Sequence, residues 1–224
     1  MRPIIVTGYN NKIDTRVVDY QRMVVDKIRG SIPFFAYDYT GSDMLHGDVC
    51  NKLIHKLFYE YQEGADCLLF LDIDCIPLSE KAITWTLQQA YAGRLVGNAQ
   101  RSNHYENDEH VFAAISYAAF TRDTYEKAGS PTMAFSKKYD CSELLTVNCE
   151  KNNIPVTLLL PSTSDSPNEE GKYWELTKDM PKYGIGTTFT NGEMDICYHL
   201  FCSRLHKYNK LFFNKCHNII TGDE

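Results

Sequence analysis

The sequence predicts an α/β protein with a mostly parallel sheet in its first half and a mixed sheet in its second half. Over residues 1–74, short apolar runs alternate with segments of helical apolar spacing, and the turns between them are brief. This alternation is typical of a parallel sheet with helices on its faces. The later residues lack such regularity. We expect a single domain of 224 residues, with halves at residues 1–78 and 79–224.

The composition excludes several classes of protein. A net charge of −6 and a pI of about 5.6 argue against a nucleic-acid binder, which would present a basic face. No signal peptide is visible, and no run approaches the roughly 20 apolar residues that span a bilayer. The eight cysteines form no CxxC pair, which favours buried thiols in a reducing compartment. We therefore expect a soluble, cytoplasmic protein whose contact with a membrane, if any, is peripheral.

The first half is expected to contain three strands and two helices. Residues 2–9 form the first strand, and Asp14 caps a helix with a valine-rich face. Residues 32–38 form the second strand. Apolar residues at helical spacing follow from about residue 48, and the third strand covers residues 67–72.

The second half is expected to mix helices and strands with longer loops. We predict strands at residues 94–100, 111–120 and 154–162, and helices at 79–92, 121–129, 139–153 and about 192–207. The stretch 162–193 is predicted to be a long loop, which is too long for a simple connector.

Polar side chains follow the three predicted parallel strands at their carboxyl ends. In open α/β sheets, ligands bind beyond these ends. The residues found there are Thr7, Gly8 and Tyr9 after the first strand, Asp38 after the second, and Asp72 and Asp74 after the third. The sequence therefore places a candidate binding site at this edge.

Asp72 and Asp74 allow three interpretations. They form a plain turn that Pro77 terminates, or they bind a divalent cation, since carboxylates are ligands that Mg²⁺ and Mn²⁺ prefer. Alternatively, Asp72 is the nucleophile of a haloacid-dehalogenase-like phosphatase. Those enzymes place the motif on the first strand, whereas here it follows two βα units.

The stretch FLDIDCIPL (residues 70–78), placed after a β-α-β-α-β pattern, resembles the nucleotide-sugar glycosyltransferases of the GT-A fold. The resemblance implies a Rossmann-like nucleotide-sugar-binding half at residues 1–78, and an acceptor half with a C-terminal lid or helix at residues 79–224. It also implies a sugar donor, for which we expect a UDP-sugar, a carbohydrate acceptor, and Mn²⁺ or Mg²⁺ as cofactor.

The resemblance also assigns donor-binding roles. Asp74 would bind the metal directly, and Asp72 would contact the ribose or a metal-bound water. The loop of Thr7, Gly8 and Tyr9 would hold the base, with Tyr9 stacked on uracil, although a plain βα turn explains it equally well. Asp38 would contact the base or ribose, or be an exposed turn residue.

Two later segments match places where the family carries functional side chains. In inverting members an acid at a helix start deprotonates the acceptor. Asp140 fits this position and Glu143 is the alternative, although the two also form the D-x-x-E pattern of a capping box. A further metal ligand would come from the C-terminal region, with His199 as first choice and Asp195 or His206 as alternatives to it.

Other basic residues are candidates for substrate contacts. The Gly-rich segment around Trp174 is expected to be a lid or a surface loop, and its lysines at 172, 178 and 182 would meet the diphosphate. Arg101 or His104 is expected near the sugar.

Three other functions remain open. A dehalogenase-like phosphatase would use Asp72, and a sugar nucleotidyltransferase would need a Gly- and Arg-rich loop after the first strand, which VTGYNNKIDTR matches poorly. A non-catalytic module that binds sugar nucleotides would keep the fold without turnover.

Overall fold

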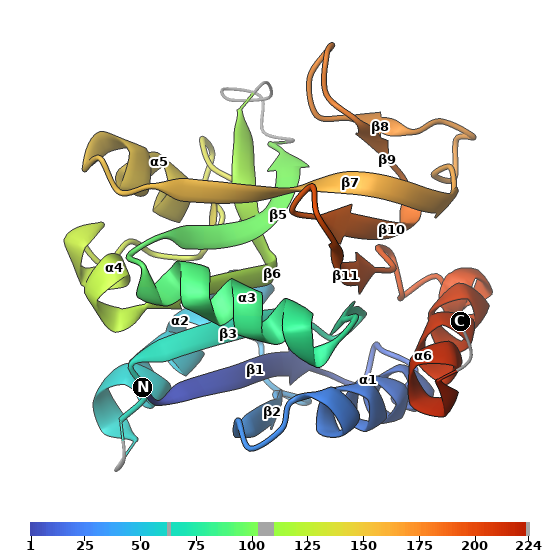
Figure 1. Cartoon of the computed structure of the whole chain (residues 1–224), viewed down its shortest axis with the longest axis horizontal. Coiled ribbons are helices and arrows are strands. Elements are labelled where there is room, and N and C mark those ends of the chain that lie inside the picture. Colours follow the sequence, from blue (N-terminus) through green and yellow to red (C-terminus); the bar gives the residue numbers. More distant parts are fainter. Residues whose placement is uncertain (62–63, 103–109, 223–224) are drawn as a thin grey trace.

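A computed structural model describes residues 1–61, 64–102 and 110–222. Nine strands form one sheet in the order β2-β1-β3-β6-β5-β7-β10-β11-β4 (Figure 1). The strands are β1 (Pro3–Tyr9), β2 (Phe34–Asp38), β3 (Cys67–Asp72), β4 (Cys75–Pro77), β5 (Leu95–Arg101), β6 (Val111–Thr121), β7 (Val156–Ser166), β10 (Ile185–Thr190) and β11 (Asp195–His199). A separate two-stranded ribbon consists of β8 (Trp174–Glu175) and β9 (Lys182–Tyr183).

The described helices cover both faces of the sheet. They are α1 (Thr15–Ile28), α2 (His46–His55), η1 (Lys56–Glu60), α3 (Glu80–Tyr91), α4 (Arg122–Lys127), α5 (Glu143–Lys151), η2 (His206–Tyr208) and α6 (Asn209–Thr221). Figure 1 shows α3 in front of the sheet and α2 behind it. The predicted α/β class, with a parallel first half and a mixed second half, is confirmed, because β2, β1 and β3 are parallel and β3 pairs with β6 in antiparallel fashion. The division into halves at residue 78 stays a prediction.

Two apolar layers explain why the central strands are hydrophobic throughout. Leu68 and Phe70 of β3 point into a cluster with α2, whereas Leu69 and Leu71 point to the opposite cluster, which contains residues of α1 and α3. Successive side chains of a strand face opposite sides of the sheet, so a strand covered on both faces needs apolar residues at every position.

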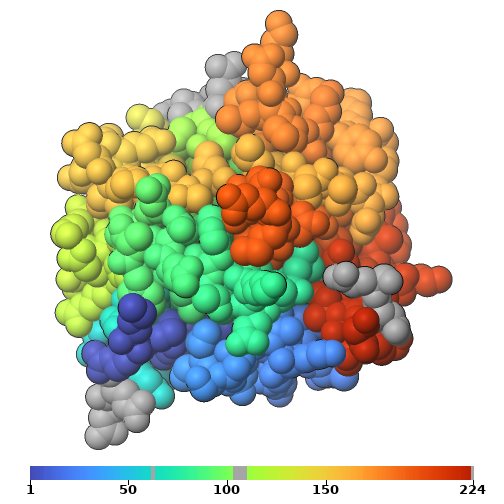
Figure 2. Space-filling model, in the orientation of Figure 1, coloured from blue at the N-terminus to red at the C-terminus, as the bar shows by residue number. Residues whose placement is uncertain are grey.

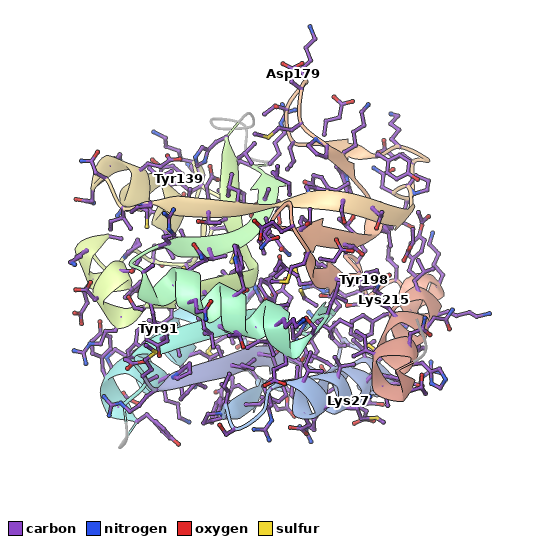
Figure 3. The ribbon with its side chains drawn as sticks, viewed as in Figure 1. Lys27, Tyr91, Tyr139, Asp179, Tyr198 and Lys215 are labelled. Carbon is purple, nitrogen blue, oxygen red and sulfur yellow. The ribbon has the colours of Figure 1, made fainter. Side chains whose placement is uncertain are left out.

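The C-terminal helix packs against the first helix of the chain. Lys27 of α1 donates a hydrogen bond to the carbonyl of Ile220 at 2.6 Å, and the rings of Tyr20 and Phe213 stack at 5.0 Å. The red C-terminal segment lies against the blue N-terminal one in Figure 2. Lys215 of α6 lies 5.8 Å from the ring of Tyr198, and both residues are labelled in Figure 3. The sequence analysis predicts no helix beyond about residue 207, so α6 is a correction.

The predicted loop at 162–193 and the predicted helix at 192–207 are both wrong. Residues 185–199 form the hairpin of β10 and β11. Asn191 and Gly192, between two apolar runs, are the usual signal for a hairpin turn, and Gly192 has a φ of +93°. The helical spacing inferred around His199 thus arose from a buried strand. Such short apolar runs fit either structure by periodicity alone.

None of the helices in the described ranges is long and apolar enough to cross a membrane.

Gly47 offers a test of how α2 is seated. A Cβ at this position would lie 2.5 Å from Ala134 Cα and 2.6 Å from the Met133 carbonyl oxygen. We expect Gly47→Ala to lower the free energy of unfolding by about 1–3 kcal/mol, as overpacking usually does. Denaturant unfolding measures this change, with the exposed Asp43→Ala as control. Equal stability of Gly47→Ala and wild type would contradict this seating of α2.

Candidate functional site

The carboxyl ends of the first and third strands bring the predicted donor-side residues to one edge of the sheet. Gly8 of β1 is in register with Asp72 of β3, and Tyr9 is in register with Asp38 of β2. Parallel strands of one sheet end at the same edge, so this register follows directly from the β-α-β-α-β order. Thr7 lies one position deeper and is 1% exposed.

The C-terminal hairpin brings a histidine to the same edge. After Asp74, the short strand β4 pairs in antiparallel fashion with β11, and His199 lies opposite Cys75. The Leu200 N–H donates a hydrogen bond to the Asp74 carbonyl at 2.9 Å. A segment of the C-terminal region therefore meets the Asp72–Asp74 turn of the first half.

Asp72, Asp74 and His199 form a compact cluster. One ligand atom from each lies within 4.8 Å of the others. His199 Nε2 is 3.3 Å from an oxygen of Asp74 and 3.9 Å from one of Asp72. Asp74 is 8% exposed and His199 5% exposed. Of the candidates for a third ligand, the structure brings His199 to the acids, whereas Asp195 accepts a hydrogen bond from Ser162 and His206 faces Asp14.

Hydrogen bonds keep the buried carboxylate ionised. Burial alone would raise the pKa of Asp74, but hydrogen bonds from His199 and from the Ser203 N–H outweigh it and lower that pKa to about 2. Asp72 contacts His46 of α2, with 3.2 Å between Oδ1 and Nε2. Burial would lower the pKa of His46, but the Asp72 carboxylate raises it to about 9. Each acid thus has an imidazole partner, His46 for Asp72 and His199 for Asp74.

These three side chains fit a divalent cation. Carboxylates are hard ligands and imidazole is a borderline one, and Mn²⁺ accepts both kinds. The Nδ1 atom of His199 is buried and has no hydrogen-bond partner among the described residues, while Nε2 faces both acids. The imidazole is thereby already oriented to present one nitrogen to an ion between the carboxylates.

The cluster lies in an open cavity of about 540 Å³. Donor-side candidates Gly8 and Tyr9 line it, together with Tyr39 and Gln100. Thr7 and Asp38 lie outside the described lining; the Asp38 carboxylate instead accepts a hydrogen bond from the Thr40 N–H. The cavity therefore combines acids, aromatic rings and amides at one edge.

A strained loop completes the cavity wall. Phe201 and Cys202 have φ values of +54° and +56°, a left-handed conformation that is uncommon outside glycine. It brings the Ser203 N–H within 3.4 Å of Asp74 Oδ2, and Arg204 lines the cavity.

Arg204 and His46 were not found by sequence reasoning. A basic residue shortly after the predicted ligand His199 was the only available signal for Arg204.

Asp140 and Glu143 occupy different environments. Glu143 is fully buried, and its carboxylate accepts hydrogen bonds from Ser102 Oγ at 2.8 Å and the Asp140 N–H at 2.7 Å, and contacts His110 Nδ1 at 2.7 Å. Asp140 is only partly buried, and its Oδ2 lies 3.5 Å from Nε2 of Gln100, which lines the cavity. The reciprocal capping box is half formed, because the Asp140 carboxylate accepts from the Cys141 N–H instead.

The other predicted basic contacts lie elsewhere. Lys182 pairs with Glu175 along the β8–β9 ribbon, and Lys172 pairs with Glu170. Lys178 is exposed next to Asp179, which Figure 3 shows at the tip of the projection above β8. Among the described residues that line the cavity, Arg204 is the only Lys or Arg. His104 lies outside the described residues.

A thiol pair adjoins this site. Cys50 of α2 is buried, and its Sγ lies 3.8 Å from His46 Nε2. A hydrogen bond from the Cys50 thiol lowers the pKa of Cys141, although burial opposes this. Burial instead raises the pKa of Cys202, which is the exposed cysteine.

Alkylation of Cys141 by iodoacetamide should therefore reach half of its maximal rate at a lower pH than alkylation of Cys202, because the thiolate is the nucleophile. The pH midpoint reports the thiolate fraction of each cysteine separately from its access to the reagent. Timed alkylation over a pH series followed by mass spectrometry measures both midpoints, and unfolded protein is the control in which they converge. A higher midpoint for Cys141 than for Cys202 in the folded protein would contradict this environment for Cys141.

Comparisons with known proteins bear on the fold. No protein-family model matches the chain, and a search of curated proteins finds no match. Among solved structures, a glycosyltransferase involved in glycosylation of the major capsid of PBCV-1 is similar with a TM-score of 0.52 and 11% identity, covering 94% of this chain and 98% of that one. The catalytic domain of Drosophila β1,4-galactosyltransferase 7, in complex with xylobiose, gives a TM-score of 0.44 and 12% identity over 70% of this chain and 63% of its own.

The similarity to the capsid glycosyltransferase spans both the parallel first half and the mixed second half. The resemblance predicted from FLDIDCIPL is thereby confirmed at the level of the fold: the chain has the GT-A-type fold of nucleotide-sugar glycosyltransferases.

Proposed function

We propose that the protein is a metal-dependent glycosyltransferase that moves a sugar from a nucleoside-diphosphate sugar to a hydroxyl of a carbohydrate acceptor. The first candidate donor is a UDP-sugar. The observation that carries this proposal is the cluster of Asp72, Asp74 and His199 inside the 540 Å³ cavity. The fold agrees with it but does not by itself decide function.

The donor side of the cavity suits a nucleotide. Tyr9 lines it at the end of β1 and offers a ring on which a base can stack. Asp72, Asp74 and His199 would hold Mn²⁺ or Mg²⁺, which when bound neutralises charge on the departing diphosphate. Because one ligand is an imidazole, we expect Mn²⁺ to bind more tightly than Mg²⁺. Arg204 supplies a cation for the same phosphates from the cavity wall.

The acceptor side is assigned to Asp140. In an inverting transfer, the acceptor oxygen forms a bond to C1 of the sugar while the bond between C1 and the diphosphate oxygen breaks. Asp140 takes the acceptor proton, and the nucleoside diphosphate leaves. Glu143 is less suited to this role, because its buried carboxylate is already occupied by Ser102, His110 and the Asp140 N–H.

Calorimetric titration of UDP with and without Mn²⁺ tests the donor assignment. Wild type should bind UDP only with Mn²⁺ present. Asp74→Asn should weaken that binding by about 100-fold or more, since even outer contacts of metal ligands are worth about 10–100-fold. The exposed Asp43→Asn is a matched control that should bind as wild type does. Absence of metal-dependent binding for UDP and other nucleoside diphosphates would overturn the proposal and favour a phosphatase that uses Asp72.

Turnover distinguishes an enzyme from a binding module. With Mn²⁺ and a UDP-sugar that binds, wild type should release UDP, and release should increase with a suitable saccharide. We expect Asp140→Asn to lower transfer to the acceptor by about 100- to 10,000-fold, the usual contribution of a general base, while donor binding stays unchanged. Binding without any release of UDP would indicate a non-catalytic module, and full transfer by Asp140→Asn would contradict its role as base.

A further inference from the structure

Gln21 is a buried polar residue on an otherwise apolar helix face. It lies on α1 among Val17, Val24 and Val25, and all four side chains are 0% exposed. An amide group placed in such surroundings costs free energy unless it is hydrogen-bonded. An apolar side chain at this position would avoid that free-energy cost, so the presence of an amide needs a specific explanation.

The Gln21 amide bridges the two ends of the acidic turn. Its Nε2 donates one hydrogen bond to the Asp72 carbonyl at 2.6 Å and another to the Cys75 carbonyl at 2.8 Å. The amide nitrogen has two hydrogens, and both are used here. The Oε1 atom has no hydrogen-bond partner among the described residues. The side chain is therefore committed to the turn through its donor half.

This bridge spans the backbone that carries both carboxylates. Asp72 ends β3, Cys75 begins β4, and Asp74 lies between them. The Asp74 carbonyl is held separately by the Leu200 N–H at 2.9 Å. Hydrogen bonds to the carbonyls of Asp72, Asp74 and Cys75 thus fix the turn from two sides, α1 and the residue that follows β11.

We propose that Gln21 is a positioning residue for the metal site: by holding the Asp72 and Cys75 carbonyls together, it sets the spacing of the Asp72 and Asp74 carboxylates. The proposal rests on the proposed metal-dependent function. Gln21 is not among the described residues that line the cavity, so we expect it to contact neither metal nor substrate. Its effect comes through the backbone, because loss of the bridge lets the turn open and the two carboxylates separate.

Gln21→Met tests this role, since methionine has a similar length and no donor. We expect the dissociation constant for Mn²⁺ to rise by about 10- to 100-fold, the range for residues that orient metal ligands. Gln21→Glu should have at least as large an effect, because a carboxylate oxygen would face the two carbonyls. Calorimetry with Mn²⁺ alone measures affinity, and thermal unfolding measures stability in parallel.

Thr86→Val is the matched control for general loss of stability. Thr86 is also 0% exposed on a helix, and its hydroxyl is hydrogen-bonded to the Ala82 carbonyl at 2.8 Å and to Tyr117 Oη at 3.0 Å, rather than to the carbonyls of Asp72 and Cys75. It should lower stability while leaving Mn²⁺ affinity unchanged. Folded Gln21→Met with wild-type affinity for Mn²⁺ would overturn the proposal, whereas a wild type that binds no Mn²⁺ would overturn the proposed function instead.

A measurement on wild type keeps the test open if the Gln21 variants do not fold. In protein labelled with ¹⁵N-glutamine, the Gln21 side-chain amide should exchange its hydrogens slowly, and its signal should shift when Mg²⁺ and UDP are added. A rapidly exchanging amide, or one that does not respond to the ligand, would overturn the bridge as a positioning device.

Discussion

The pairing of β4 with β11 is the contact on which the site depends. It is only three residues long, yet it places His199 opposite Cys75 and beside the acids of β3. So short a ladder needs support from packing. Ile76 and Tyr198 supply it, since both belong to an apolar cluster with Phe212 of α6. The C-terminal helix therefore supports the site indirectly, because it packs against the strand pairing that brings His199 to the two acids.

Two acids one residue apart at a buried strand end repel each other, and the fold offsets this repulsion in distinct ways. Asp72 has the His46 imidazole from α2, and Asp74 has His199 and the Ser203 N–H. Removing one partner of a buried charge is expensive, because the other charge stays desolvated. The strained backbone at Phe201 and Cys202 belongs to the same arrangement, since it aims the Ser203 N–H at Asp74. Strain at such positions persists where the surrounding structure over-determines it.

The features predicted correctly from the sequence are those that depend on the pattern of residues close together in the chain. The β-α-β-α-β order and the edge with Asp72 and Asp74 follow from apolar periodicity and from where strands end. His199 was selected as a ligand, but on a helix, because a short buried strand and a helical segment share the same apolar run and the Asn-Gly turn before it was overlooked. The position of Arg204 depends on the left-handed backbone of Phe201 and Cys202, which is uncommon outside glycine. The hydrogen-bond partners of Gln21 lie 51 and 54 residues away in the chain. The local sequence pattern indicates neither of these two features.

The charges at this edge bear on how an acidic chain would bind a diphosphate, the leaving group of the proposed reaction. Asp72 and Asp74 bring two negative charges to the cavity, and Arg204 and a protonated His46 bring two positive ones. His46 is engaged with Asp72, so among the described residues that line the cavity, Arg204 is the cation that would face an incoming phosphate group. One cation would not balance a diphosphate beside two carboxylates, whereas a divalent ion held by Asp72, Asp74 and His199 would supply the missing positive charge. Under the proposed function, the two acids would therefore recruit the positive charge that an acidic protein needs beside a diphosphate.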